Sequence, residues 1–269
     1  SEIAASLNNL AAVADQHGRH AEAEELLREC LAIHRRLGEP WGEVFALCNL
    51  AEVACEQAAY AQATALVEEG LAIARRWGSL SATAYTVGML GYISYSRSDY
   101  TEAARRWGES LALRREQGDR YSIAFCLLRL AIIAREQTHY SSALALYHES
   151  LTLYASLAVT KGAVECLEGI ACVAALTGQA ACEAWLCGAA MALRESIGVP
   201  HELRDTAYIR AGALAQQTPE DANFMAAWEA SHELSLDLVI RHALPRIAEL
   251  VARCEALPYP HQNAMAMMT

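Results

Sequence analysis

The chain repeats itself every 40 residues, and this constrains the fold more than any other feature. When the sequence is shifted by that interval, apolar residues fall into fixed columns: Leu7, Leu47, Val87, Leu127 and Leu167 form one, and Leu10, Leu50, Leu90, Leu130 and Ile170 form another. A third column is always small: Ala11, Ala51, Gly91, Ala131 and Ala171. Five units in one register indicate a repeat architecture, in which each unit packs on its neighbours.

Each unit has the pattern of two helices joined by a short turn. In the first unit the spacing predicts a helix over about residues 3–16, a turn in which Gly18 takes the left-handed conformation, and a second helix that runs to about residue 37. Gly38, Gly78, Gly118 and Gly198 share the phase at which the second helix ends, and only Ala158 departs from it. The chain holds 54 alanines and only 6 prolines, and alanine is the best helix former. We therefore expect an all-α stack of antiparallel helical hairpins.

Composition excludes several classes of function. The formal net charge of −11 argues against binding to a nucleic-acid backbone, and no apolar run is long enough to cross a bilayer. The nine cysteines are odd in number and form no CxxC pair, so we expect neither a disulfide framework nor a zinc cluster. Most of them occupy small-residue columns, while Cys48 and Cys55 are expected on the opposite helix face. This usage fits a reducing cytoplasm, with no metal or cofactor. Because the chain starts at Ser1 without a methionine, we expect it to be a piece of a longer protein.

The repeat resembles the tetratricopeptide repeat of the longer, roughly 40-residue kind. The residues that carry the resemblance are Leu50-Ala51, Tyr60, Ala63 and Leu71 in the second unit, Leu90-Gly91, Tyr100, Ala103 and Leu111 in the third, and Leu130-Ala131, Tyr140, Ala143 and Leu151 in the fourth. The first unit matches with Leu10-Ala11 and Ala23, and the fifth is weaker, with Ala180 and Glu183 at the tyrosine and alanine places. The resemblance implies a right-handed solenoid of helical hairpins.

The C-terminal part differs from the repeats. We expect five repeats over residues 1–200, C-terminal capping helices over 201–257 and a tail over 258–269. A helix is predicted to start at Thr218–Asp221 and to pass through Trp228, and Ser235 is predicted to cap a last helix. The segments 185–195, 224–229 and 234–237 are similar to the closing part of repeat domains in bacterial signalling ATPases, including LuxR-type and MalT-like regulators. Such regulators also carry a nucleotide-binding switch domain, for which this sequence has no Walker motif.

One face of the first helices is free for function. At 100° per residue the apolar columns share one side, and in tetratricopeptide repeats the opposite side lines the groove in which partners bind. In the middle units this opposite side is aromatic and apolar, which favours a binding surface over simple exposure. The candidate groove residues are Asn9, Phe45, Asn49, Glu52, Tyr85, Tyr92, Tyr95, Phe125, Leu128, Arg129, Ile132 and Arg135.

The polar members of this set have alternative interpretations. The resemblance implies that Asn9 and Asn49 hydrogen-bond the backbone of a bound peptide, for which an amide is suited because it both donates and accepts. Arg129 and Arg135 could hold a carboxylate, or they could be solvated or paired with a glutamate such as Glu136. The whole face could instead be covered by self-packing, with the tail 258–269 as one occupant.

These observations predict a non-enzymatic module that recognises a protein or peptide segment, in a bacterial signalling or transcriptional regulator. Two alternatives remain open. A small effector would be favoured by a closed apolar pocket near Tyr85, Tyr92 and Phe125. An assembly arm would form homo-oligomers through an exposed end repeat, where Leu7 and Leu10 have no preceding unit. No acid–base pair or catalytic motif is present in the sequence, so an enzyme is not expected.

Overall fold

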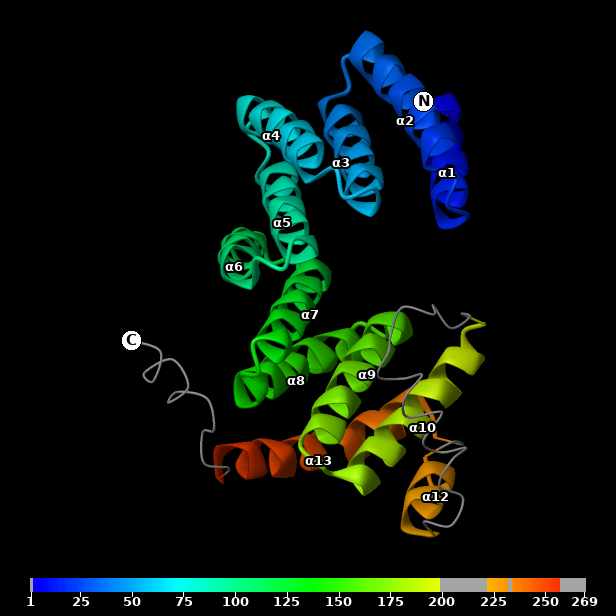
Figure 1. Ribbon diagram of the computed structural model, residues 1–269, viewed down its shortest axis with the longest axis vertical. Coiled ribbons are helices and arrows are strands. Elements are labelled where there is room, and N and C mark those ends of the chain that lie inside the picture. Colours follow the sequence, from blue (N-terminus) through cyan, green and yellow to red (C-terminus); the bar gives the residue numbers. More distant parts are fainter. Residues whose placement is uncertain (1, 199–221, 232–233, 257–269) are drawn as a thin grey trace. The chain divides into compact units, whose positions relative to one another are not determined.

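The computed structural model describes residues 2–198, 222–231 and 234–256, and these residues are almost entirely helical (Figure 1). The helices are α1 (Glu2–Gln16), α2 (His20–Leu37), α3 (Pro40–Glu56), α4 (Tyr60–Trp77), α5 (Leu80–Ser96), α6 (Tyr100–Gln117), α7 (Arg120–Glu136), α8 (Tyr140–Ser156), α9 (Thr160–Leu176), α10 (Ala180–Ser196), α12 (Ala222–Glu229) and α13 (Leu236–Ala256). The bounds of α1 and α2 agree with the prediction, and the all-α fold of helical hairpins is confirmed.

Both connections in every repeat pass through the left-handed region. Gly38, Gly78 and Gly118 end the second helices with φ of 65°, 73° and 66°, and Ala158 adopts 53° at the same place although it is not glycine. One residue in the turn inside each repeat also has a positive φ, for example Gly18 at 71° and Thr138 at 62°. Because the amide two residues past each helix end bonds back to a carbonyl of the last turn, the helices end at repeated positions.

The helices pack into two compact units, Ser1–Cys126 and Leu127–Thr269, with the division inside α7. We call them unit 1 and unit 2 and describe each by itself. In unit 1 the helices pair as α1–α2, α3–α4 and α5–α6, and each pair stacks on the next through the α2–α3 and α4–α5 contacts. The first helices α3 and α5 also touch each other. This is the arrangement expected of stacked antiparallel hairpins.

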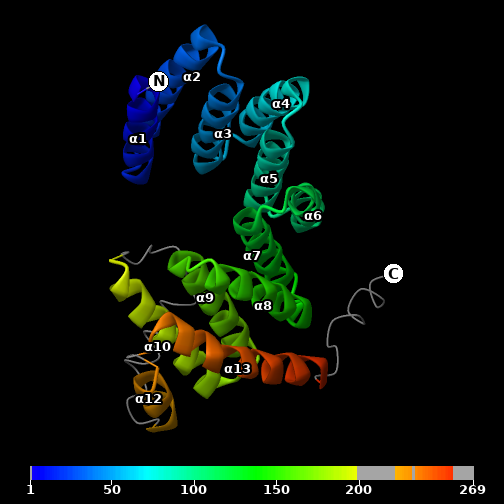
Figure 2. The ribbon, with the colours of Figure 1, turned by 180° about the vertical axis from the view of Figure 1, so that it is seen from behind.

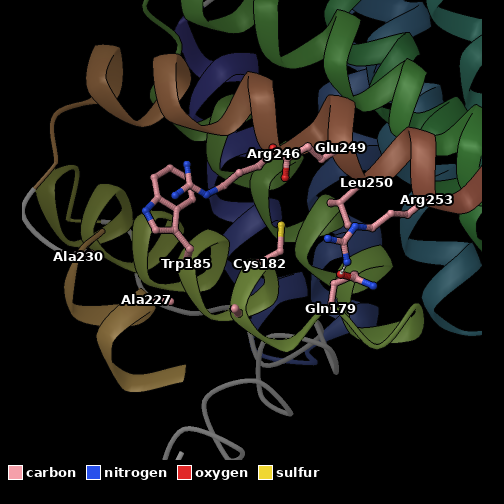
Figure 3. Close-up of a pocket in the computed structure, with 10 residues that line it drawn as sticks. Gln179, Cys182, Trp185, Ala227, Ala230, Arg246, Glu249, Leu250 and Arg253 are labelled. Atoms are coloured by element: carbon pink, nitrogen blue, oxygen red, sulfur yellow. Dashed lines mark hydrogen bonds between the residues drawn. The ribbon is translucent and has the colours of Figure 1, made fainter. Parts of the chain in front are cut away.

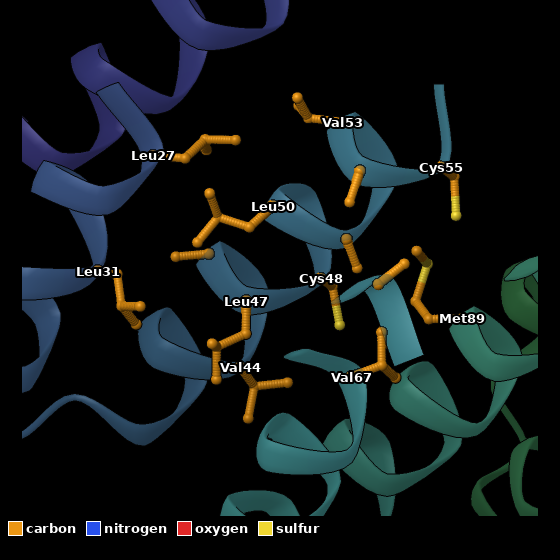
Figure 4. Close-up of a cluster of buried hydrophobic side chains, with 14 of the residues drawn as sticks. Leu27, Leu31, Val44, Leu47, Cys48, Leu50, Val53, Cys55, Val67 and Met89 are labelled. Atoms are coloured by element: carbon orange, nitrogen blue, oxygen red, sulfur yellow. The ribbon is translucent and has the colours of Figure 1, made fainter. Parts of the chain in front are cut away.

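The repeating columns build the core of unit 1. Leu47, Leu50 and Val53 of α3 are 0%, 5% and 3% exposed, and they face Leu27 and Leu31 of α2 (Figure 4). The small column is buried too, which lets neighbouring helices approach closely. The assignment of these columns to the packing side is therefore confirmed.

The prediction that Cys48 and Cys55 lie on the free face was wrong. Both are buried, at 0% and 7% exposure, and Figure 4 places Cys48 among core side chains that include Val67 and Met89. Contacts between α3 and α5 cover this edge of α3, which a helical wheel of one isolated repeat does not show. The cysteines in small-residue columns do pack as predicted, and the Cys30 thiol donates to the carbonyl of Ala4 at 3.3 Å.

Thiol chemistry provides a direct measure of this packing. Seven of the nine cysteines are buried, and only Cys182 and Cys254 are partly exposed. Burial raises the pKa of Cys55 to about 11 and that of Cys166 to about 12, so neither forms a thiolate at pH values near 8. We expect Ellman's reagent to react quickly with at most two thiols of the native protein and with all nine after denaturation. Rapid reaction of four or more thiols in the native state would contradict this burial.

In unit 2 the rings of two tyrosines of α8 lie against two glycines of α9. A Cβ at Gly169 would come within 2.3 Å of the Tyr147 ring, and one at Gly162 would come within 2.5 Å of the Tyr154 ring. The two tyrosines are seven residues apart on α8, and the two glycines are seven residues apart on α9. This spacing places each pair on one face of its helix. Only glycine allows this close approach of the two helices.

The C-terminal helices pack onto the last repeats. α12 packs on α10, and α13 lies against α8, with further contacts to α9 and α10 (Figure 2). The expected helix through Trp228 and the expected last helix after Ser235 are both present, and α13 continues through Pro245. The predicted helix start at Thr218–Asp221 and the tail 258–269 lie outside the described residues. Across the described part of the chain, no helix is both long and apolar enough to span a membrane.

Candidate interaction surface

Aromatic side chains of α3 and α5 contact one another in unit 1. The Phe45 and Tyr85 rings stack with centroids 6.0 Å apart, and Trp41 meets Tyr85 at 5.9 Å. Trp41 is 44% and Phe45 is 37% exposed, while Tyr85 and Tyr92 are partly buried. We call Trp41, Phe45, Tyr85 and Tyr92 the aromatic face. Phe45 and Tyr85 of the candidate set are thus in contact, and Trp41 and Phe45 remain open to solvent.

Trp41 was missed by the sequence reasoning. It lies in the first turn of α3, which Pro40 begins, and it precedes Phe45 by four residues. Residues four apart share a helix face, so this spacing was the signal that could have identified it. Trp41 enlarges the aromatic face with its most exposed ring.

Two carboxylates lie on the same side of α3. Glu52 and Glu56 are exposed, seven and eleven residues after Phe45, which are spacings of one helix face. Burial, followed by the nearby charges of Glu56 and Glu52, raises the pKa of Tyr92 to about 12. The pKa of Tyr85 is also raised, first by burial and then by Cys48 and Glu52. The carboxylate of Glu52 therefore acts on both tyrosines.

The other candidates in unit 1 are placed differently. Tyr95 contacts Tyr100 of α6 with ring centroids 5.7 Å apart, and Phe125 packs edge-on against Trp107 of α6 at the same distance. Asn9 is exposed. The Asn49 amide donates to the Asn8 side chain at 2.5 Å, so one of its donors is already used within the protein. The second helix α6 thus supplies ring partners that a pattern limited to first helices does not reveal.

The four candidates in unit 2 are more buried or paired. Leu128 is only 1% exposed and packs in the core, so it offers no surface to a ligand. Ile132 is partly buried. Arg129 lies 3.8 Å from Glu165, and Arg135 bonds Glu136 at 2.8 Å, as the pairing alternative expected.

A pocket of about 330 Å³ lies in unit 2 between α10, α12 and α13 (Figure 3). Arg246 stacks over the Trp185 ring at 4.3 Å, and Arg253 donates to the Gln179 side chain at 2.5 Å. Cys182 and Leu250 add apolar lining. Two guanidinium groups, held by a ring and an amide, thus line the pocket together with the carboxylate of Glu249. Tyr85, Tyr92 and Phe125, near which the effector alternative expected a pocket, are not among the residues that line it.

Comparison with known proteins agrees with this architecture. Residues 2–76 match the family model described as tetratricopeptide repeat. The fold is a tetratricopeptide-like helical repeat. The predicted resemblance to tetratricopeptide repeats is confirmed by this match and by the solved structures that the chain resembles. No curated protein sequence matches the chain.

Three solved repeat structures illustrate the likeness. A Rap protein complexed with Competence and Sporulation Factor has 17% identity and a TM-score of 0.60, with 94% of this chain and 66% of that chain covered. BtubC from P. vanneervenii has 16% identity and a TM-score of 0.59, with 93% and 96% covered. A signal transduction ATPase with numerous domains and a tetratricopeptide repeat sensor, from Pyrococcus horikoshii, has 14% identity and a TM-score of 0.59, with 97% and 42% covered. At these identities the likeness concerns the fold.

The first and last parts of this tetratricopeptide-like fold depart from its regular pattern. On α1, Leu10 is 56% and Val13 is 46% exposed, whereas Leu50 and Val53 in the same columns are buried against α2. Among the described residues no helix packs on that side of α1.

In the fifth repeat, Arg194 of α10 makes two bonds, of 2.6 and 2.7 Å, to Glu168 of α9. This ion pair was not predicted.

No metal site emerges from the described residues, which contain no group of three or more histidine, cysteine or acidic side chains able to hold an ion. His17 and His20 flank the first turn, and each ring contacts an oxygen atom of the protein. His17 lies 2.7 Å from the carbonyl of Val13, and His20 lies 2.8 Å from the carboxylate of Asp15.

Proposed function

We propose that this chain is a non-catalytic recognition module of a cytoplasmic signalling regulator, and that it binds a polypeptide segment on the aromatic face of unit 1. The observation that carries the proposal is the exposure of Trp41 and Phe45 beside Tyr85 on helices whose other faces are packed. Large aromatic rings that remain in contact with water are enriched where partners bind, because their burial supplies much of the binding energy.

The comparisons support the same reading. A Rap protein of this fold has been crystallised with Competence and Sporulation Factor, and the Pyrococcus horikoshii ATPase carries its tetratricopeptide repeats as a sensor. Binding at a repeat face would influence an attached domain by favouring one of its conformations.

Selection from a displayed library of random peptides, each of about twelve residues, tests the proposal. We expect wild-type protein to enrich binders, and the Phe45→Ala/Tyr85→Ala variant to bind them at least ~10-fold more weakly, because the ring surface is lost. Trp77→Ala is the matched control, since Trp77 is 49% exposed at the end of α4 and lies off this face.

Circular dichroism of all three proteins shows whether the helical fold is retained. Equal affinity of wild type and the double variant for the enriched peptides, or failure of the library to yield any binder, would contradict the proposal.

Binding of a small effector is the second candidate, and the pocket between α10 and α13 favours it. Arg246 and Arg253 are held there by Trp185 and Gln179, and their two positive charges exceed the single negative charge of Glu249, so an anionic molecule would meet donors that are already positioned. The affinity for such a ligand would be unchanged by Phe45→Ala/Tyr85→Ala and lowered by Arg246→Ala. This difference separates the two candidate functions.

A further inference from the structure

Charge is divided between the two helix layers of unit 1. The first helices α1, α3 and α5 contain no arginine, lysine or histidine, whereas they carry five acids: Glu2, Asp15, Glu43, Glu52 and Glu56. All nine arginines in helices α1 to α6 lie on the second helices α2, α4 and α6. The layer that carries the aromatic face is therefore acidic, whereas the nine arginines of the layer behind it are accompanied by nine acids on the same helices.

The acids of α3 are next to the aromatic face. Glu52 and Glu56 are exposed on the helix side that presents Phe45, and Glu52 influences both Tyr85 and Tyr92 of α5. A surface that places carboxylates beside exposed ring faces attracts a cation in two ways. The carboxylates provide charge attraction, and the negative faces of the rings provide a cation–π interaction.

One cation of the neighbouring helix lies close enough to act on this face. Arg114 of α6 acts on Tyr85, but it is buried and lies 3.4 Å from Asp119. The absence of cations is confined to α1, α3 and α5, because the later first helices α7 and α9 carry both signs of charge, with Arg120, Arg129, Arg135 and Lys161 beside Glu136, Glu165 and Glu168.

We infer that the aromatic face of unit 1 takes a basic segment of a partner protein, with arginine or lysine side chains over the rings of Trp41 and Phe45 and beside Glu52 and Glu56. This inference rests on the proposed function and adds the chemistry of the partner. Apolar side chains of the segment cover the rings, and its cations pair with the carboxylates. An acidic segment is repelled by the same surface.

Three fluorescein-labelled peptides of about twelve residues test the inference. They share the same leucine and phenylalanine positions and carry arginine, glutamine or glutamate at the others. Fluorescence anisotropy measures their affinities at about 50 mM and about 300 mM salt. We expect the arginine peptide to bind at least ~10-fold more tightly than the glutamine peptide, and this advantage to shrink at the higher salt.

Two double variants separate a local effect from net charge. Glu52→Gln/Glu56→Gln is expected to weaken binding of the arginine peptide by roughly 5- to 10-fold. Glu25→Gln/Glu29→Gln makes the same change in charge at the same spacing on an exposed part of α2, and it is expected to leave the affinity within about 2-fold. Exposed substitutions of this kind leave a fold intact.

The outcomes distinguish this inference from the proposed function. Three results would overturn the inference of a basic partner. The first is that the glutamine or glutamate peptide binds as tightly as the arginine peptide or more tightly, and the second is that both double variants weaken binding equally. The third is that no peptide binds. If the glutamine peptide binds as well as the arginine peptide and still needs Phe45 and Tyr85, the proposed function stands without the charge preference. If the affinity for the arginine peptide is the same in wild type and in Phe45→Ala/Tyr85→Ala, the proposed function itself fails.

Discussion

Replacing Glu168 by alanine is expected to lower the free energy of unfolding by about 3–5 kcal/mol. Glu168 is 3% exposed, and both its carboxylate oxygens accept bonds from Arg194, whose side chain is 13% exposed. The variant removes the carboxylate that compensates the burial of this guanidinium, and it leaves space between α9 and α10. Denaturation by urea, followed by circular dichroism, measures the loss.

Glu165→Ala is the matched control on the same helix. Its partner Arg129 lies at 3.8 Å, and the two side chains are 31% and 35% exposed, so the expected cost is below about 1 kcal/mol. A Glu168→Leu/Arg194→Met variant removes both charges and is expected to recover most of the stability. If Glu168→Ala costs no more than Glu165→Ala, the ion pair does not stabilise unit 2.

Gly169→Ala is expected to destabilise the protein by about 1–3 kcal/mol, although alanine is the better helix former. The new Cβ would come within 2.3 Å of the Tyr147 ring, and this ring is 0% exposed and cannot move into solvent. The helices α8 and α9 would have to separate, which loosens the packing around them. The midpoint of thermal unfolding measures the effect.

Gly108→Ala supplies the opposite expectation. Gly108 lies inside α6, and a Cβ there meets nothing within 4 Å, so the alanine should raise stability by about 0.4–1 kcal/mol. Replacing the ring by a smaller side chain, in the double variant Gly169→Ala/Tyr147→Leu, should restore part of the lost stability. A stabilising effect of Gly169→Ala alone would show that the tyrosine does not lie on the glycine as described.

The predicted and observed candidate surfaces overlap only in part. Phe45, Tyr85 and Tyr92 were identified from their columns, because aromatic residues opposite the apolar side of a helix stand out in a helical repeat. Leu128 could not be distinguished from them, since a helical wheel treats each helix as isolated while burial depends on the neighbouring helices. Trp41 was missed because it lies in the first turn of α3, outside the columns considered. The pocket near Trp185 combines α10 with α12 and α13, which lie outside the 40-residue pattern, so no column could reveal it.

The sequence by itself determined the repeat. Apolar columns every 40 residues and helix-ending residues in a constant phase specify where each helix begins and ends, because these signals act over a few residues. Only the tertiary structure decided which side chains remain exposed. Cys48 and Leu128 share a column that was predicted to face the groove, yet contacts between helices bury both, and Arg194 meets Glu168 across 26 residues. Burial and ion pairing depend on distances between helices, which a one-dimensional pattern does not contain.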